Sequence, residues 1–150
     1  MASGIKLNDS VVEIYNSFKK STGGGIKYRA LQLALSSKNT EFEVEKKITT
    51  RDDMSVEEEF QLIADSLPFD DCRYLLYDIQ AVDAENVHQN KILLISWSPD
   101  SARVDKKMLY ASSKGTIKQS LDINTADFVA TDHSELKFRD VCERAKIRLA

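Results

Sequence analysis

The fold follows from the stretch KILLISWSPDS at residues 91–101. Its segment 92–95 is apolar on both faces of an extended chain, which indicates a central strand covered on both sides. Residues 98–101 then combine turn-forming side chains with a proline, so they end the strand. A long helix is predicted immediately afterwards, over roughly 102–121. A helix packed on a doubly buried strand indicates a sheet protein with helical layers.

Helix and strand patterns alternate on either side of this stretch. In chain order we predict a helix over about 9–20, strands over 28–35 and 42–48, a helix from Ser55 to Pro68, strands over 72–82 and 91–97, the helix over 102–121, a strand over 123–129 and a helix capped by Ser134 with an inner stripe of Leu136, Val141, Ala145 and Leu149. The first two strands form a hairpin with one face in water, because Glu41, Glu43 and Glu45 alternate with apolar residues. A polar loop is expected over 83–90.

No repeat or linker interrupts the chain, so we expect one domain over residues 1–150. The predicted order corresponds to an α/β fold of the α+β type, in which a mixed central β-sheet is flanked by helices on both faces. The 42% hydrophobic and 30% charged residues are those of an ordinary soluble globular protein. Two cysteines, Cys72 and Cys142, are too few for a disulfide framework and are expected to be reduced thiols in the cytoplasm.

Charge is distributed unevenly along the chain. The net charge of −3 provides no basic field for nucleic acid, so no nucleic-acid partner is expected. Residues 41–80 hold twelve Asp and Glu against four Lys and Arg, whereas residues 103–120 hold five Lys and Arg against one Asp. An acidic half and a basic segment predict one electropositive face, which suits an acidic protein surface or anionic head groups.

Catalytic and metal-binding patterns are missing from the sequence. His88 and His133 fall in predicted loops without a neighbour at metal-ligand spacing, and are expected to be solvated. The adjacent carboxylates of 52–53 and 70–71 are expected to point apart as turn or cap residues. Glycines 23–25 form a loop but no phosphate cradle, because no Gly-Lys-Ser/Thr follows. We therefore expect no enzyme, no cofactor and no metal, while a small α/β enzyme with an unrecognised site stays an alternative.

The helix over 102–121 carries a stripe of cations. At about 100° per residue, four cations and one alanine lie within roughly 40° of one common direction around the helix axis. These residues are Arg103, Lys107, Ala111, Lys114 and Lys118. Their charges are expected to repel rather than pair, since the only acidic residue near them in sequence is Asp105. Opposite them lie Leu109, Ser113, Thr116, Ile117 and Ser120, which can pack on a sheet. The stripe is either a solvated face or a binding face.

Residues 97–102 (WSPDSA) and 107–114 (KMLYASSK) closely resemble the W-[SA]-P-[DE]-x-A and K-M-x-Y-[AST]-S-[ST]-K signature of ADF/cofilin proteins. Further similar segments lie at residues 2–5, 67–68, 71–78, 130–132 and 143–144, so the resemblance covers nearly the whole chain. It implies the ADF-homology fold and a monomeric, non-enzymatic protein of the cytoplasm and actin cytoskeleton. Such a protein binds actin monomers and filaments and promotes filament severing and depolymerisation.

The resemblance also implies two actin-binding surfaces. The monomer-side residues are Ser3, Gly4, Arg103, Lys107, Met108, Lys114 and Lys118. The filament-side residues are Lys91, Glu143, Arg144, Lys146 and Arg148. Ser3 corresponds to the serine whose phosphorylation inactivates family members. Phosphoinositide head groups are implied as competing ligands of the same cations.

Some residues depart from the family pattern. Gln89 and Ile147 replace filament-side basic residues, Asp105 replaces a basic residue of the helix, and Gly115 replaces an aspartate. The alternative function is therefore a monomer-binding or coactosin-like filament-binding module that does not sever. The pair Lys46-Lys47 is too short to match the basic nuclear-import segment of the family. Nuclear entry is possible, but no basic segment of this sequence supports it.

Overall fold

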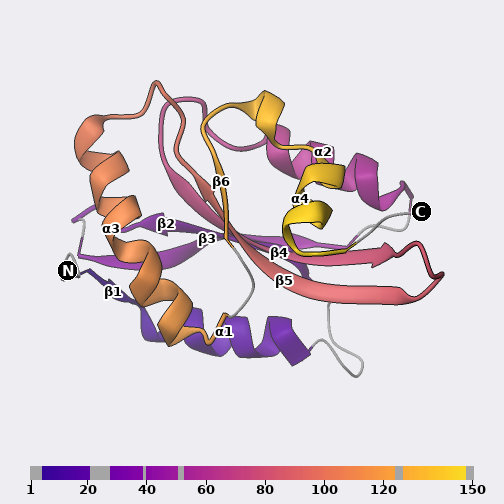
Figure 1. Ribbon diagram of the computed structural model, residues 1–150. Helices are drawn as coiled ribbons and strands as arrows, with labels where there is room; N and C mark the ends of the chain where they lie inside the picture. The colour runs from indigo at the N-terminus through magenta and orange to yellow at the C-terminus, as the bar shows by residue number, and fades with distance from the viewer. Residues whose placement is uncertain (1–4, 21–27, 39, 51–52, 124–126, 148–150) are drawn as a thin grey trace.

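The computed structural model describes residues 5–20, 28–38, 40–50, 53–123 and 127–147 (Figure 1). A six-stranded sheet runs in the order β1-β3-β2-β4-β5-β6. The strands are β1 Lys6–Leu7, β2 Tyr28–Leu35, β3 Glu41–Thr49, β4 Arg73–Val82, β5 His88–Trp97 and β6 Phe128–Ala130. The helices are α1 Asp9–Lys20, α2 Val56–Asp65, α3 Val104–Ser120 and α4 Phe138–Arg144, with a 3₁₀ turn, η1, at His133–Glu135. The β1–β3 and β5–β6 pairs are parallel and the other pairs antiparallel, so the predicted mixed sheet is confirmed.

Helices cover both faces of this sheet, as predicted. Figure 1 shows α1 and α3 on one side and α2 and α4 on the other. Tyr15 of α1 and Ile117 of α3 belong to the core of the first side, and Phe60 of α2 and Val141 of α4 to the core of the second. Among the described residues, no helix combines the length and apolar character needed to cross a membrane.

The strand that contains residues 92–95 is buried on both faces. Leu94 packs into the core below α1 and α3, whereas Leu93 and Ile95 pack into the core below α2 and α4. On one edge the strand pairs with β4 along its whole length, and on the other with β6. The continuous apolar run therefore reflects two helical layers, as the sequence predicted.

The turn between β4 and β5 is shorter than the loop predicted over 83–90, because β5 already begins at His88. Val82 pairs with His88, and the carboxylate of Asp83 accepts hydrogen bonds from the backbone N–H groups of Glu85 (3.0 Å) and Val87 (2.9 Å). Asn86 has a φ of 64°, a conformation that asparagine tolerates well. The polar character of residues 88–90 predicted a loop, but these residues pair with β4 as the first part of β5.

Only one strand of the β2–β3 hairpin has the solvent-exposed face that the sequence predicted. Residues 29–34 of β2 are all buried, because β4 pairs with the edge of β2 opposite β3 and helices cover both faces of the strand. In β3 the side chains of Glu43 and Glu45 are exposed, as predicted. Glu45 is an extra residue in a bulge, and the register shift there sends Ile48 to the core opposite that of Phe42.

Several predicted boundaries near the C-terminus are wrong. The final helix is not capped by Ser134: Asp132 accepts a hydrogen bond from the N–H of Ser134 and caps η1, and α4 starts only at Phe138. Leu136, Val141 and Ala145 are buried as predicted, whereas Leu149 lies outside the described residues. Strand β6 spans Phe128–Ala130 and so overlaps the strand predicted over 123–129 only at 128–129, while residues 124–126 lie outside the described residues. Earlier in the chain, helix α2 ends at Asp65, before the expected stop at Pro68, and Ser66 is its C-cap.

A buried ion pair joins β2 to α2. The Arg29 Nε and Glu59 Oε1 atoms are 2.6 Å apart, and the two side chains are 7% and 3% exposed. Arg29 lies at a register shift of β2, between Tyr28 paired with Thr49 and Ala30 paired with Ile48. Burial of two charges is tolerated because each is the partner of the other.

We expect Arg29→Met to lower the free energy of unfolding by about 3–5 kcal/mol, because it removes a cation from beside the buried Glu59 carboxylate. Urea unfolding followed by circular dichroism measures this change. The double variant Arg29→Met with Glu59→Leu is the matched control and should recover much of the lost stability. Equal stability of the single and double variants would contradict the interpretation.

Candidate functional site

The outer face of α3 is fixed by the side that packs on the sheet. Tyr110, Ser113 and Ile117 are buried, so the opposite side of the helix faces outward. We define the α3 face as Arg103, Val104, Lys107, Met108, Ala111, Lys114 and Lys118. Of the packing residues predicted from the sequence, Ser113 and Ile117 are buried, Leu109 and Thr116 are half-buried, and Ser120 is exposed.

Tyr110 anchors the middle of α3 to the sheet. Its hydroxyl accepts a hydrogen bond from the backbone N–H of Leu35 (2.9 Å), and the Tyr74 hydroxyl donates to the Tyr110 carbonyl. The rings of Phe42, Tyr74 and Tyr110 pack together with centroids 5.0 to 5.2 Å apart. Burial raises the pKa of Tyr110 to about 12. This cluster holds the helix so that Lys107, on the turn before Tyr110, faces outward.

Two exposed apolar side chains of α3 lie among its cations. Val104 is 70% exposed and Met108 is 67% exposed, one helical turn apart. Val129, in the middle of β6, is also exposed. Met108 belongs to the monomer-side set predicted from the sequence, whereas Val104 and Val129 do not. The i,i+4 spacing of Val104 and Met108 could have revealed the first, whereas the exposure of Val129 depends on β6 lying at the sheet edge.

The cations of α3 are paired more fully than the sequence predicted. Lys114 Nζ lies 2.7 Å from Asp127 Oδ2, and Lys118 Nζ lies 3.1 Å from Asp127 Oδ1. Partial burial alone would raise the pKa of Asp127, but the hydrogen bonds from both lysines outweigh it and lower the pKa to about 2. The expectation that these charges repel without a partner is therefore wrong. Asp127 lies beyond the helix, where helical spacing could not reveal it.

The remaining cations of the α3 face have other partners. The Lys107 ammonium donates to the backbone carbonyl of Asp100 (2.9 Å), which holds it at the start of the helix. Arg103 Nε lies 3.1 Å from Asp105, and both side chains are largely exposed. A surface pair of this kind contributes little to stability. Arg103 therefore stays available to a partner.

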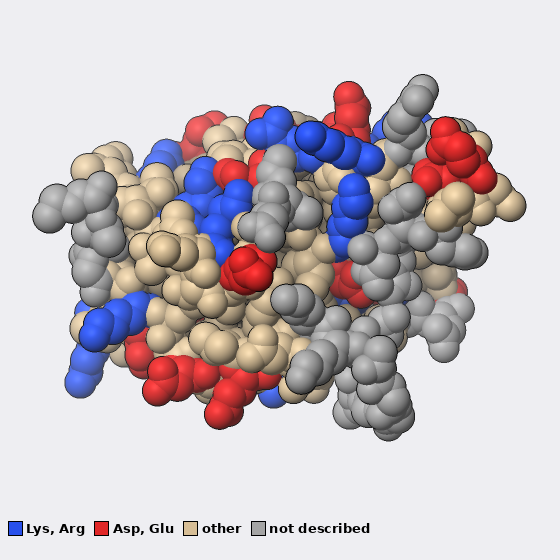
Figure 2. Space-filling view, turned by 60° about the horizontal axis from the view of Figure 1, so that its bottom comes forward, with Lys and Arg blue, Asp and Glu red and all other residues tan. Residues whose placement is uncertain are grey.

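A small pocket opens beside this face. It has a volume of about 110 Å³ and lies between α3, the start of β4, the end of β5 and the middle of β6. Its lining includes Lys107, Tyr110, Ala111, Lys114 and Val129. Figure 2 shows Lys and Arg side chains gathered in the upper middle of one face and again at its lower left, while Asp and Glu lie along its lower edge and also at its upper right. Charges of one sign therefore form groups on this face, but the two signs are not fully separated.

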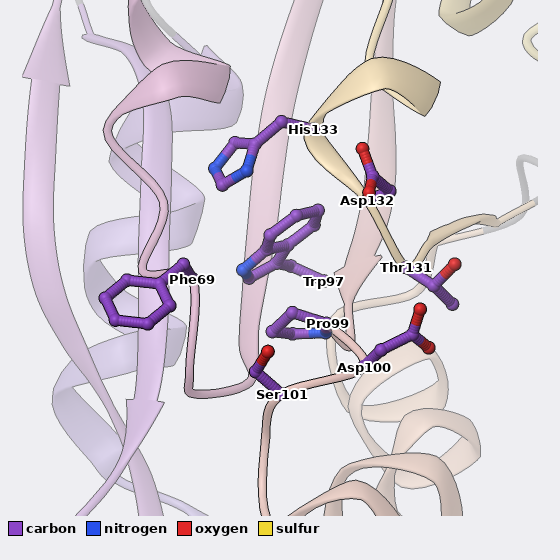
Figure 3. Close-up of a pocket in the computed structure, with 8 residues that line it drawn as sticks. All are labelled: Phe69, Trp97, Pro99, Asp100, Ser101, Thr131, Asp132 and His133. Atoms are coloured by element: carbon purple, nitrogen blue, oxygen red, sulfur yellow. The ribbon is translucent and has the colours of Figure 1, made fainter.

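A second pocket, of about 160 Å³, lies where β5 leads into α3 (Figure 3). Trp97 is at its centre; its indole N–H donates to the carbonyl of Pro68 (2.6 Å), and the His133 ring packs on it at 4.6 Å. His133 Nε2 also lies 3.1 Å from the carbonyl of Leu67. The prediction of a solvated His133 is wrong, because the ring is half-buried and packed.

Among the described residues, no group of three or more His, Cys, Asp or Glu side chains could hold a metal ion, in this pocket or elsewhere. Asp71 is engaged by its neighbours: its carboxylate accepts from the backbone N–H of Cys72 and from Arg73. Cys72 and Cys142 are free and buried, and burial raises the pKa of the Cys142 thiol to about 11.

The predicted filament-side residues lie around α4. Lys91 Nζ donates to the backbone carbonyl of Ala145 (2.8 Å), where a cation complements the helix C-terminus. Arg144 Nε donates to the backbone carbonyl of Asp127 (3.0 Å). Glu143 and Lys146 are exposed. The last residue of this predicted set, Arg148, lies outside the described residues, as do Ser3 and Gly4 of the monomer-side set.

The described chain begins beside α3. Strand β1 pairs in parallel with β3 and contacts α3, and Ile5 is buried in the core below α1 and α3. Asn8 fixes the entry into α1: its backbone N–H donates to the carbonyl of Phe42, and its side chain donates to Glu41. Residues 5–8 are therefore held at the β1 edge of the sheet, next to α3.

We expect the Asp127 carboxyl to titrate near pH 2. Because its pKa is lower in the folded than in the unfolded chain, its ion pairs stabilise the fold above about pH 4, and this contribution is lost as the pH falls through about 2. Side-chain carboxyl NMR measures the titration. The double variant Lys114→Met with Lys118→Met should raise the pKa toward its ordinary range, and an ordinary value in the unmodified protein would contradict the assignment.

The comparisons with known proteins agree with this geometry. Residues 4–146 match the model of the family described as cofilin/tropomyosin-type actin-binding protein. The chain is 36% identical to actin-depolymerizing factor 9 of Oryza sativa subsp. japonica over 144 residues, 96% of each chain. It is 36% identical to cofilin of Schizosaccharomyces pombe over 142 residues, 95% of each chain. The crystal structure of Streptomyces griseoflavus cofilin superposes with a TM-score of 0.77 at 34% identity, covering 95% of this chain and 97% of that one.

These similarities confirm the ADF-homology fold and the resemblance found in the sequence. The family consists of non-enzymatic actin-binding proteins, which agrees with the prediction that this protein is not an enzyme. The matched segment, 4–146, contains all of the α3 face. The chain belongs to the ADF/cofilin family and is an actin-binding protein of the cofilin/ADF type.

Proposed function

We propose that this protein binds actin monomers through the α3 face and binds filaments through a second surface around α4, and thereby promotes filament severing and depolymerisation. The observation that carries the proposal is the α3 face itself. It combines two exposed apolar side chains, Val104 and Met108, with cations that the fold holds in place. Relatives named cofilin and actin-depolymerizing factor support the same activity.

The composition of the α3 face suits a partner cleft with an apolar floor and acidic walls. Burial of an exposed methionine and valine provides apolar contact area, worth about 25 cal/mol per Å². Ala111 is exposed between Lys107 and Lys114, so its small side chain allows a close approach of the helix to its partner. The cations then supply the electrostatic complementarity that orients the complex.

Severing requires more than filament binding. A protein shifts a filament between two states only by the difference in its affinity for them. We place the second contact at Glu143 and Lys146, both exposed near the end of α4, together with Arg144. Contact with two neighbouring actin subunits at once would favour a filament state that differs from the relaxed one.

A non-severing function is the alternative, and one observation favours it. Lys91 is engaged with the backbone carbonyl of Ala145 at 2.8 Å and is only half-exposed. A lysine held against the C-terminus of α4 has less freedom to reach a second actin subunit. A protein with a working α3 face and a weak second surface would bind and sequester monomers.

Regulation follows from the same charges. We include in the proposal that the protein acts as a monomer in the cytoplasm, that phosphoinositide head groups compete for the cations of the α3 face, and that phosphorylation of Ser3 weakens actin binding. A phosphate adds about −1.5 to −2 charge, which would repel an acidic partner surface. Anionic lipids would occupy the lysines that otherwise meet that surface.

Charge reversal tests the monomer-side surface. We expect Lys107→Glu with Lys114→Glu to weaken binding to actin monomers by at least roughly thirtyfold, because two interfacial cations become anions. Sedimentation velocity with labelled actin measures the affinity. Lys137→Glu with Arg139→Glu makes the same charge change at two exposed positions around the start of α4 and should leave monomer binding intact. Unchanged binding of the α3 variant would refute the proposed surface.

Filament co-sedimentation with imaging of filament length separates the two functions. We expect the unmodified protein to pellet with filaments and to shorten them. Glu143→Lys with Lys146→Glu should abolish pelleting and shortening while monomer binding is kept, because both exposed charges of the second surface are reversed. Monomer binding by the unmodified protein without pelleting or shortening would establish the sequestering alternative instead.

A further inference from the structure

We infer that Asp127 is a positioning residue of the actin-binding surface, which orders Lys114 and Lys118 of α3 before a partner arrives. The inference rests on the proposed function of the α3 face and adds to it a residue outside the helix and outside the signature segments. Asp127 immediately precedes β6, and its carboxylate reaches across to two successive turns of α3.

The geometry divides the Asp127 carboxylate between the two lysines. Oδ2 accepts from Lys114 at 2.7 Å and Oδ1 accepts from Lys118 at 3.1 Å. The lysine side chains remain 31% and 25% exposed, so neither is buried beneath the contact. An ammonium has three N–H donors, and a partner carboxylate can therefore still reach both cations.

Without this carboxylate the two lysines would interfere with each other. They are four residues apart on α3, a spacing at which like charges destabilise a helix. A free lysine side chain also occupies many rotamers, and ordering such side chains is one of the costs of association. Asp127 offsets the repulsion and restricts the rotamers while the protein is unbound.

The same residue connects α3 with α4. Arg144 donates to the backbone carbonyl of Asp127 at 3.0 Å, so the segment before β6 contacts cations of both helices. The contact to Arg144 uses a backbone atom, whereas the contacts to Lys114 and Lys118 use the side chain. A change of the carboxylate therefore alters the α3 contacts and leaves the acceptor of Arg144 in place.

Positioning and simple neutralisation predict opposite effects of removing this charge. If Asp127 only reduced the positive charge of the surface, its loss would strengthen binding to an acidic partner. If Asp127 instead orders the two lysines, its loss has two effects. The added positive charge speeds association at low salt, and the disordered lysine side chains make dissociation faster. Affinity and association rate then change in opposite directions.

The experiment compares Asp127→Asn with Asp105→Asn, using actin monomers as the probe. Each variant removes one negative charge beside α3 and keeps the shape of the side chain, but Asp105 pairs with the exposed Arg103 and holds neither lysine. Stopped-flow rates are measured from low salt to about 0.15 M ionic strength. Thermal midpoints of both variants control for loss of folded protein.

We expect Asp127→Asn to weaken monomer binding by roughly three- to tenfold at the higher salt, the effect of two long side chains that must be ordered on binding. The loss should lie in faster dissociation, with an association rate at low salt that is equal or higher. Asp105→Asn should increase the association rate without a loss of affinity. Unchanged or tighter binding of the Asp127 variant would overturn the inference.

A double-mutant cycle between Asp127→Asn and Lys114→Met shows through which group Asp127 acts. In the Lys114→Met background the Asp127 change should cost clearly less than it does alone, a coupling that general destabilisation would not produce. Additive losses would overturn the positioning role while leaving the proposed surface intact. No effect of Lys114→Met by itself would overturn both.

Discussion

The pairing of β4 with β5 is the interaction on which the rest of the structure depends. The two strands pair along their whole lengths, and the paired centre, residues 74–79 of β4 and 93–95 of β5, is buried on both faces. A sheet centre of this kind requires a helical layer on each side, because apolar side chains point alternately to the two faces. The layers of α1 with α3 and of α2 with α4 meet that requirement.

The position of α3 follows from this sheet. Tyr110 is the key contact, since it accepts hydrogen bonds from the backbone N–H of Leu35 in β2 and from the Tyr74 hydroxyl of β4, and packs against Phe42 of β3. Three strands therefore determine the rotation of the helix about its axis. Once that rotation is fixed, Val104 and Met108 must face outward among the cations. The orientation of the α3 face, the proposed binding surface, is a consequence of how the opposite side of the helix packs.

Electrostatic contacts link the two predicted actin-binding surfaces. The Asp127 carboxylate pairs with Lys114 and Lys118 of α3, and the Asp127 backbone carbonyl accepts a hydrogen bond from Arg144 of α4. Lys91 of β5 meets the end of α4. Cations that look unpaired in the sequence thus have partners contributed by loops and helix ends. These contacts order the cations of the proposed actin-binding surface, and Lys114 and Lys118 still remain partly exposed.

The sequence by itself determined the helix over 9–20, the strand over 28–35, the doubly buried strand at 92–95 and the cationic stripe of the long helix, because each depends on local side-chain periodicity. Only the tertiary structure decided which cations are paired, that Ile48 changes faces after the bulge at Glu45, and that His133 packs on Trp97. These depend on residues distant in sequence that meet only when the sheet forms, so no spacing along the chain records them.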